Sequence, residues 1–198
     1  MVAHKKGSPE ARPAVVPAPG QAVVVRLDGR DVVVWWGRGP GDREVLAARD
    51  GRVMTWESVE AAVAHAEESE WEVDWDAGIS SDQATLMDFT GAQRRLESER
   101  APVAPQSAMF LWNFATDVAH TLGLPFNDKG RLADECYDKL TRATMPDHFG
   151  LVDHRLQWTP AEFKVVRRIM GEAVHVVRLG LGLAKQRGAR PDEATRPR

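Results

Sequence analysis

The chain has 198 residues, 43% of them hydrophobic and 28% charged, which is typical of one globular domain or two small ones and excludes wholesale disorder. No apolar run approaches the roughly 18–20 residues of a membrane helix, and the single cysteine, Cys136, excludes an internal disulfide and fits a reducing compartment. We therefore expect an unexported, cytoplasmic protein without membrane contact.

The N-terminal third predicts strands joined by tight turns. Residues 1–20 contain four prolines and no sustained periodicity, which predicts a flexible leader. Two β-hairpins should follow, because β-forming runs flank Asp28-Gly29 and Asp50-Gly51, and glycine accepts the positive φ of such turns. The four expected strands cover residues 21–27, 31–36, 43–49 and 52–56.

A helix and a further strand complete the expected N-terminal unit, residues 21–79. Ser58 caps a short helix that runs to about Glu68. The alternation Trp71-Glu-Val-Asp-Trp-Asp76 then places two tryptophans and a valine on one face and three carboxylates on the other, as in a half-buried strand. The expected arrangement is an antiparallel β-meander of about five strands with one helix.

The second half, residues 80–187, predicts a helical subdomain packed on the meander. About four helices are expected, at 82–97, 107–122, 131–141 and 160–185. Thr159, Pro160 and Glu162 start the last one with a capping box. Residues 188–198 are expected to form a flexible tail, and the fold class is α+β.

Three runs of this helical half carry a resemblance. They are Phe110-Leu-Trp-Asn-Phe-Ala-Thr-Asp117, Cys136-Tyr-Asp-Lys-Leu140 and Trp158-Thr-Pro-Ala-Glu162. The chain resembles uncharacterised small α+β proteins of high-GC bacteria over about residues 53–183. No activity accompanies the resemblance, so it implies a fold and transfers no functional residue.

Charge is spread unevenly along the chain. The net charge of −3 divides into +2 for residues 1–20, −10 for 21–160 and +5 for 161–198, and ten carboxylates without a lysine or arginine lie between Glu57 and Asp88. Such crowded charges need solvent or a basic partner. The face expected to meet that partner consists of Glu67, Glu68, Glu70, Glu72, Asp74 and Asp76.

The leading functional hypothesis is therefore a non-enzymatic protein-binding module that uses this acidic face against a basic protein. An inhibitor or immunity protein that neutralises a basic toxin is one concrete form, because a negative surface accelerates association with a positive one. The simpler alternative is a solvated surface without a partner.

An alternative function is a metal-assisted or acid–base enzyme. Asp117 and His120 lie three residues apart on one stripe of the 107–122 helix, where both could reach one metal ion. The Asp147–His154 segment adds His148 and His154, which could bind zinc or transfer protons. These are weak metal candidates, because the spacing matches no zinc signature, and we expect no metal and no other cofactor.

Neighbouring residues allow structural interpretations as well. Glu135 and Asp138 could complete a metal site, but Asp117 could instead accept a hydrogen bond from Tyr137 across the helices. The stripe that holds Asp117 could also simply face water.

Trp35 and Trp36 are adjacent in a predicted strand and so point to opposite faces. One should fill the core. The other should be covered by a second layer or serve as an aromatic anchor for a partner.

The basic C-terminal segment supports a third hypothesis, a nucleic-acid-associated regulator. Its helical arginines Arg167, Arg168 and Arg178 do not form one ridge, and the overall acidity argues against nucleic acid as the main ligand. The sequence contains no phosphate-binding loop, dinucleotide fingerprint, nucleophile elbow, HExxH or CxxC motif. These absences argue against the commonest enzyme classes.

Overall fold

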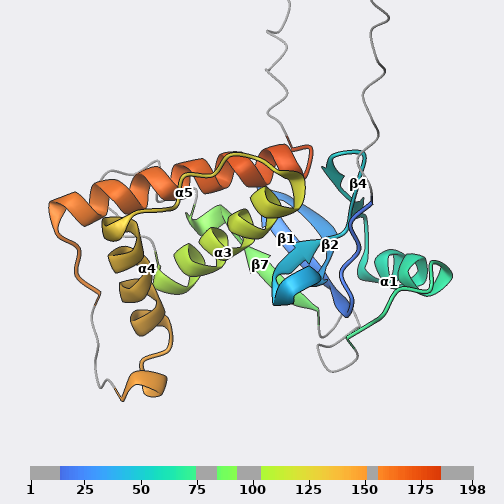
Figure 1. Cartoon of the computed structure of the whole chain (residues 1–198), viewed down its shortest axis with the longest axis horizontal. Helices are drawn as coiled ribbons and strands as arrows, with labels where there is room; N and C mark the ends of the chain where they lie inside the picture. Colours follow the sequence, from blue (N-terminus) through green and yellow to red (C-terminus); the bar gives the residue numbers. More distant parts are fainter. Residues whose placement is uncertain (1–13, 75–83, 93–103, 151–155, 184–198) are drawn as a thin grey trace, which may run out of the picture.

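The computed structural model describes residues 14–74, 84–92, 104–150 and 156–183 (Figure 1). The expected α+β class is confirmed, because strands come first along the chain and helices follow. The strands pair as β3-β2-β1-β7, with β6 also paired to β2, and β4 and β5 form a separate ribbon. Figure 1 shows α1 and α4 at opposite ends of the molecule.

Both predicted hairpin turns are present. β1 (Gly20–Leu27) and β2 (Arg30–Arg38) are antiparallel and joined by Asp28 and Gly29, which have φ of 54° and 72°. The same pair of positive φ values recurs at Asp50 and Gly51, φ 53° and 74°. The short strands that follow β2 are β3 (Glu44–Leu46), β4 (Ala48–Arg49), β5 (Arg52–Val53) and β6 (Thr55–Trp56).

The last strand corrects the expected helix at 82–97. β7 (Thr85–Asp88) pairs in parallel with Val23 to Arg26 of β1, so the sheet is mixed rather than a pure antiparallel meander. The weak apolar spacing of Leu86 and Phe89 suggested a helix, but the open edge of β1 supplies backbone partners for a strand. Helical backbone begins only at residue 90, and residues 93–97 lie outside the described part. The predicted helical half therefore contributes a strand to the N-terminal sheet.

The sheet also extends into the expected leader. Val15 exchanges backbone hydrogen bonds with Ala48, and Pro17 is buried. The predicted boundary at residue 20 is therefore too late, because backbone pairing orders the chain from at least residue 15; residues 1–13 are not described. Of the expected strand at 71–76, residues 71–74 are described and form only a bridge between Val73 and Gly20, and residues 75 and 76 lie outside the described part.

One helix covers one face of the sheet. α1 (Val59–Glu68) begins at Ser58, whose Oγ accepts a hydrogen bond from the Ala61 N–H at 3.1 Å, as predicted. Its small buried side chains pack with Ala22, Val33 and Trp35 in a core cluster of their own. One of the two adjacent tryptophans was expected in the core, and Trp35 is the one that lies there.

The opposite face is covered by the helical half. α3 (Pro105–Leu122) contacts β3, β5 and β7 on one side and α4 (Arg131–Thr144) and α5 (Pro160–Gly180) on the other, which explains why its apolar surface is so wide. The Thr159–Glu162 capping box of α5 is confirmed. Short 3₁₀ turns lie at Pro40–Asp42 (η1) and Asp147–Phe149 (η3). No helix in the described ranges is both long and apolar enough to cross a bilayer.

A candidate binding pocket between α3, α4 and β3

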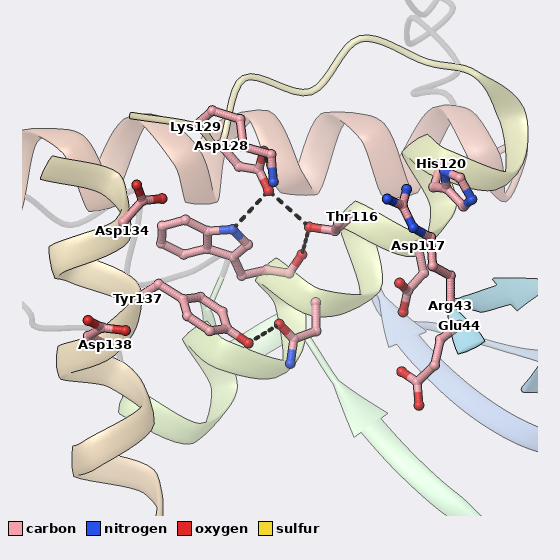
Figure 2. Close-up of a pocket in the computed structure, with 12 residues that line it drawn as sticks. Arg43, Glu44, Thr116, Asp117, His120, Asp128, Lys129, Asp134, Tyr137 and Asp138 are labelled. Atoms are coloured by element: carbon pink, nitrogen blue, oxygen red, sulfur yellow. Dashed lines mark hydrogen bonds and ion pairs between the residues drawn. The ribbon is translucent and has the colours of Figure 1, made fainter. Parts of the chain in front are cut away.

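A cavity of about 640 Å³ opens where α3, the start of α4 and the start of β3 meet (Figure 2). One face of α3 supplies five of its lining residues at helical spacing, and α4 supplies three at positions i, i+3 and i+4. The lining consists of Arg43, Glu44, Trp112, Asn113, Thr116, Asp117, His120, Asp128, Lys129, Asp134, Tyr137 and Asp138.

Asp128 is held rigidly at the wall of this cavity. Only 7% of the residue is exposed, and its Oδ2 accepts hydrogen bonds from Trp112 Nε1 at 3.3 Å and from Thr116 Oγ1 at 3.2 Å. Lys129 Nζ lies 3.4 Å from Oδ1. A buried carboxylate is tolerated when it is hydrogen-bonded and paired, so this cluster anchors the loop before α4 to α3.

Asp117 is the acidic group with the most unusual environment. Its Oδ2 accepts a hydrogen bond from Trp36 Nε1 at 3.2 Å, so the second adjacent tryptophan is covered by the α3 layer. Burial and the negative charge of Glu44 raise the pKa of Asp117 to about 7, and the hydrogen bond from Trp36, which lowers it, offsets only part of this rise. This carboxyl group is thus poised between its neutral and charged forms at neutral pH.

Tyr137 makes a different hydrogen bond from the one to Asp117 that was considered as an alternative. Tyr137 donates to Asn113 Oδ1 at 2.7 Å, one helical turn away from Asp117 (Figure 2). The Tyr137 ring packs edge-on against Trp112, with centroids 5.4 Å apart. Two aromatic rings therefore form part of the wall between the acidic groups of α3 and those of α4.

Acidic groups outnumber basic ones around the cavity. Five carboxylates line it, against the two cationic side chains Arg43 and Lys129. Asp134 and Asp138 are exposed, and no ion pair within the described ranges involves either of them. A cavity of this composition favours a cationic ligand, which can contact carboxylates and aromatic faces together.

The structure brings together only some of the predicted metal candidates. Asp117 and His120 line the same pocket, with His120 exposed. His148 lies in η3 after the end of α4, with its ring 5.3 Å from that of Phe149, and does not line the pocket. His154 is outside the described residues. Within the described ranges no three His, Cys, Asp or Glu side chains converge as a metal site.

The predicted acidic face lies around the C-terminal end of α1, away from the pocket. Glu67, Glu68, Glu70 and Glu72 are exposed. Asp74 is half-buried rather than exposed, because its backbone N–H donates to the Gly20 carbonyl at the sheet edge. Asp76 lies outside the described residues.

Three arginines in the described part of the basic C-terminal segment make contacts within the molecule. Arg178 Nε lies 2.6 Å from Asp28 Oδ2 in the β1–β2 turn, and Arg168 Nη1 lies 3.0 Å from Glu172 Oε1. The guanidinium carbon of Arg167 lies over the Phe163 ring, 5.7 Å from its centroid. These roles explain three of the basic residues that suggested nucleic-acid binding.

Several pocket residues were missed by sequence reasoning. Asp134 and Tyr137 share one α4 face with Asp138, and that helical spacing could have identified them. Glu135, considered as a ligand beside Asp138, instead pairs with Arg131 at 2.8 Å. Glu44 and Asp128 carry no local signal, because only the fold brings their segments to α3.

Comparison of the chain with protein-family models, curated proteins and solved structures finds no match. The functional argument therefore rests on the chemistry of the pocket and of the surface.

Proposed function

We propose that this chain is a non-enzymatic binding protein that takes a small organic cation into the pocket between α3, α4 and β3. The observation that carries the proposal is Asp117, a half-buried carboxyl group with a raised pKa beside Glu44, in a cavity of about 640 Å³. That volume falls within the range of small-molecule sites. Buried ionisable groups with strongly shifted pKa values concentrate at functional sites.

The pocket offers a cation two kinds of contact, carboxylates and aromatic faces. Asp117 and Glu44 lie at one end, and Asp134 and Asp138 lie on α4 at the other (Figure 2). Aromatic faces attract ammonium and guanidinium groups, and carboxylates accept their N–H bonds. A cation bound beside Asp117 would also reduce the repulsion between Asp117 and Glu44.

The test is calorimetric titration with 1,4-diaminobutane, choline and arginine amide, with neutral 1,4-butanediol as the control ligand. We expect at least one cation to bind and the diol not to bind. Asp117→Asn should weaken that binding about tenfold or more, the equivalent of about 1.4 kcal/mol for one lost charge pair.

Glu135→Gln is the matched control variant, because Glu135 is on α4 but outside the pocket lining. It should bind the cation as the unmodified protein does. Absence of binding by all three cations, or equal affinity in the Asp117→Asn variant, would contradict the proposal.

Binding should also be linked to pH. A cation gains most from the ionised form of Asp117, and the pKa of that group is about 7. Affinity should therefore rise between about pH 6 and pH 8. The Asp117→Asn variant should lose this dependence.

Acid–base catalysis is the second candidate function. A carboxyl group with a pKa of about 7 is well matched to proton transfer at neutral pH, and His120 lines the same pocket. Once a ligand is identified, incubation followed by NMR distinguishes the two functions. If the ligand is converted to a product and Asp117→Asn abolishes this conversion, the protein is a catalyst. If the ligand stays unchanged, the protein only binds it.

A further inference from the structure

Three aromatic rings cluster beside the end of α1. The ring of His65, in the last turn of α1, has its centroid 5.1 Å from that of Trp71 and 5.5 Å from that of Trp56. The centroids of the two tryptophan rings are 6.3 Å apart. All three residues are half-buried, so part of each reaches the surface. Trp35 supports them from the core, 6.0 Å from Trp71.

This cluster leaves one polar atom unsatisfied. Nε2 of His65 is shielded from solvent and has no hydrogen-bond partner in the described part of the chain. A buried polar atom without a partner costs free energy. Aromatic rings that reach the surface are also enriched at the centres of protein interfaces.

Exposed carboxylates follow the cluster along the chain. Glu68 lies one helical turn after His65, and Glu70 immediately precedes Trp71. No ion pair among the described residues involves the exposed acidic residues of this region, which are Glu67, Glu68, Glu70 and Glu72.

The placement of these charges is unfavourable for the isolated fold. The C-terminal end of a helix carries a partial negative charge and is stabilised by cations, yet Glu67 and Glu68 occupy the last turn of α1. The sequence contains no lysine or arginine between Arg52 and Arg94 that could offset them locally.

We propose that this acidic aromatic patch, formed by Trp56, His65, Trp71, Glu67, Glu68 and Glu70, is a docking surface for an arginine-bearing segment of a partner protein. A guanidinium group can stack on an indole face while its N–H groups bind carboxylates, and an ammonium group lacks that planar geometry. The proposal is independent of the pocket, which lies on the other side of the sheet.

Charge selects the class of partner. Nucleic acids and anionic membranes present phosphate groups, which the four exposed carboxylates repel. A basic protein segment is attracted by the same field, and the aromatic rings supply the buried contact that charge alone does not.

The experiment titrates the full chain at 150 mM salt with a nona-arginine peptide and with a nona-lysine peptide. Calorimetry measures affinity, and ¹H–¹⁵N spectra report which of the seven indole N–H groups shift. We expect the arginine peptide to bind at least about tenfold more tightly than the lysine peptide. The Trp56 and Trp71 indole signals should shift most.

Matched variants locate the site. Neutralising Glu67, Glu68 and Glu70 to Gln should weaken the arginine peptide about tenfold or more without loss of the fold, because all three side chains are exposed. Glu135→Gln, at an exposed α4 residue outside both the patch and the pocket lining, should leave it unchanged. Unchanged affinity in the triple variant, weaker binding in Glu135→Gln, or equal affinity for the two peptides would each overturn the proposal.

Discussion

Two acidic side chains in one pocket, the buried Asp128 and the half-buried Asp117, have very different surroundings. Asp128 has two hydrogen-bond donors and a lysine within 3.4 Å, whereas Asp117 accepts a hydrogen bond from Trp36 and has an acidic neighbour, Glu44. A carboxylate that lacks such compensation is penalised for ionising. A change of pH near neutrality should therefore change the protonation of Asp117.

Asp117→Asn should change how stability depends on pH. The raised pKa means that the folded protein keeps a proton that the unfolded chain releases between about pH 4 and pH 7. The free energy of unfolding should therefore fall as pH rises through this range, by on the order of 2–4 kcal/mol. Urea melts at pH 4.5 and pH 8 should show a smaller fall in the variant, and equal falls in both proteins would contradict the prediction.

At the scale of elements, the contact between α3 and α5 depends on one small residue. A Cβ atom at Gly180 would overlap Val118 Cγ1 of α3, so the two helices are closely packed where α5 ends. Gly171 lies in the same helix, but a Cβ there would meet nothing within 4 Å. The two glycines thus provide a matched pair.

Gly180→Ala should destabilise the protein by about 1–3 kcal/mol, because the added methyl group overpacks a tight interface. Gly171→Ala should stabilise it by about 0.5–1 kcal/mol, because alanine favours the helix more than glycine does. Denaturant unfolding measures both. Equal effects of the two substitutions would show that the helices do not meet at Gly180.

The N-terminus of α5 offers a second test. Thr159 Oγ1 accepts from the Glu162 N–H, and Glu162 Oε2 accepts from the Thr159 N–H and pairs with Lys139. Thr159→Ala should cost about 1 kcal/mol through loss of the cap. Ser58→Ala, at the α1 cap, should cost a similar amount, and thermal melts compare the two. No loss in either variant would contradict the capping geometry.

At the scale of the whole molecule, the two candidate binding regions lie on opposite faces of the sheet. The pocket lies on the side covered by α3 and α4, and the acidic aromatic patch lies beside α1, which Figure 1 shows at the other end. The sheet between them is tied to α5 by Arg178, which pairs with Asp28 of the β1–β2 turn. Because the two regions share no residue, substitutions can alter each one separately.

Truncation should separate the part of the N-terminus that belongs to the fold from the part before it. Removing residues 1–13 should leave the melting temperature nearly unchanged, since that stretch has no periodic apolar face. Removing residues 1–19 also deletes the paired backbone of Val15 and Ala18, so the melting temperature should fall by several degrees. Equal melting temperatures for the two truncated chains would contradict the role of the Val15–Ala48 pairing.

Local signals in the sequence were sufficient for the elements that depend on neighbouring residues. The Asp-Gly turns, the Ser58 and Thr159 caps and the opposite directions of Trp35 and Trp36 were all predicted, because each depends on φ preferences, short-range hydrogen bonds or strand alternation. The same signals placed Asp117 and His120 together on α3, one helical turn apart.

Only the tertiary structure decided the features that depend on distant partners. β7 became a strand because β1 had an open edge 62 residues earlier in the chain, as the pairing of Val25 with Met87 illustrates. Trp36, Glu44 and Asp128 reach Asp117 and its pocket from separate segments. Burial and neighbouring charge set the pKa of Asp117, and neither can be read from spacing along the chain, because both depend on what the fold packs around that carboxyl group.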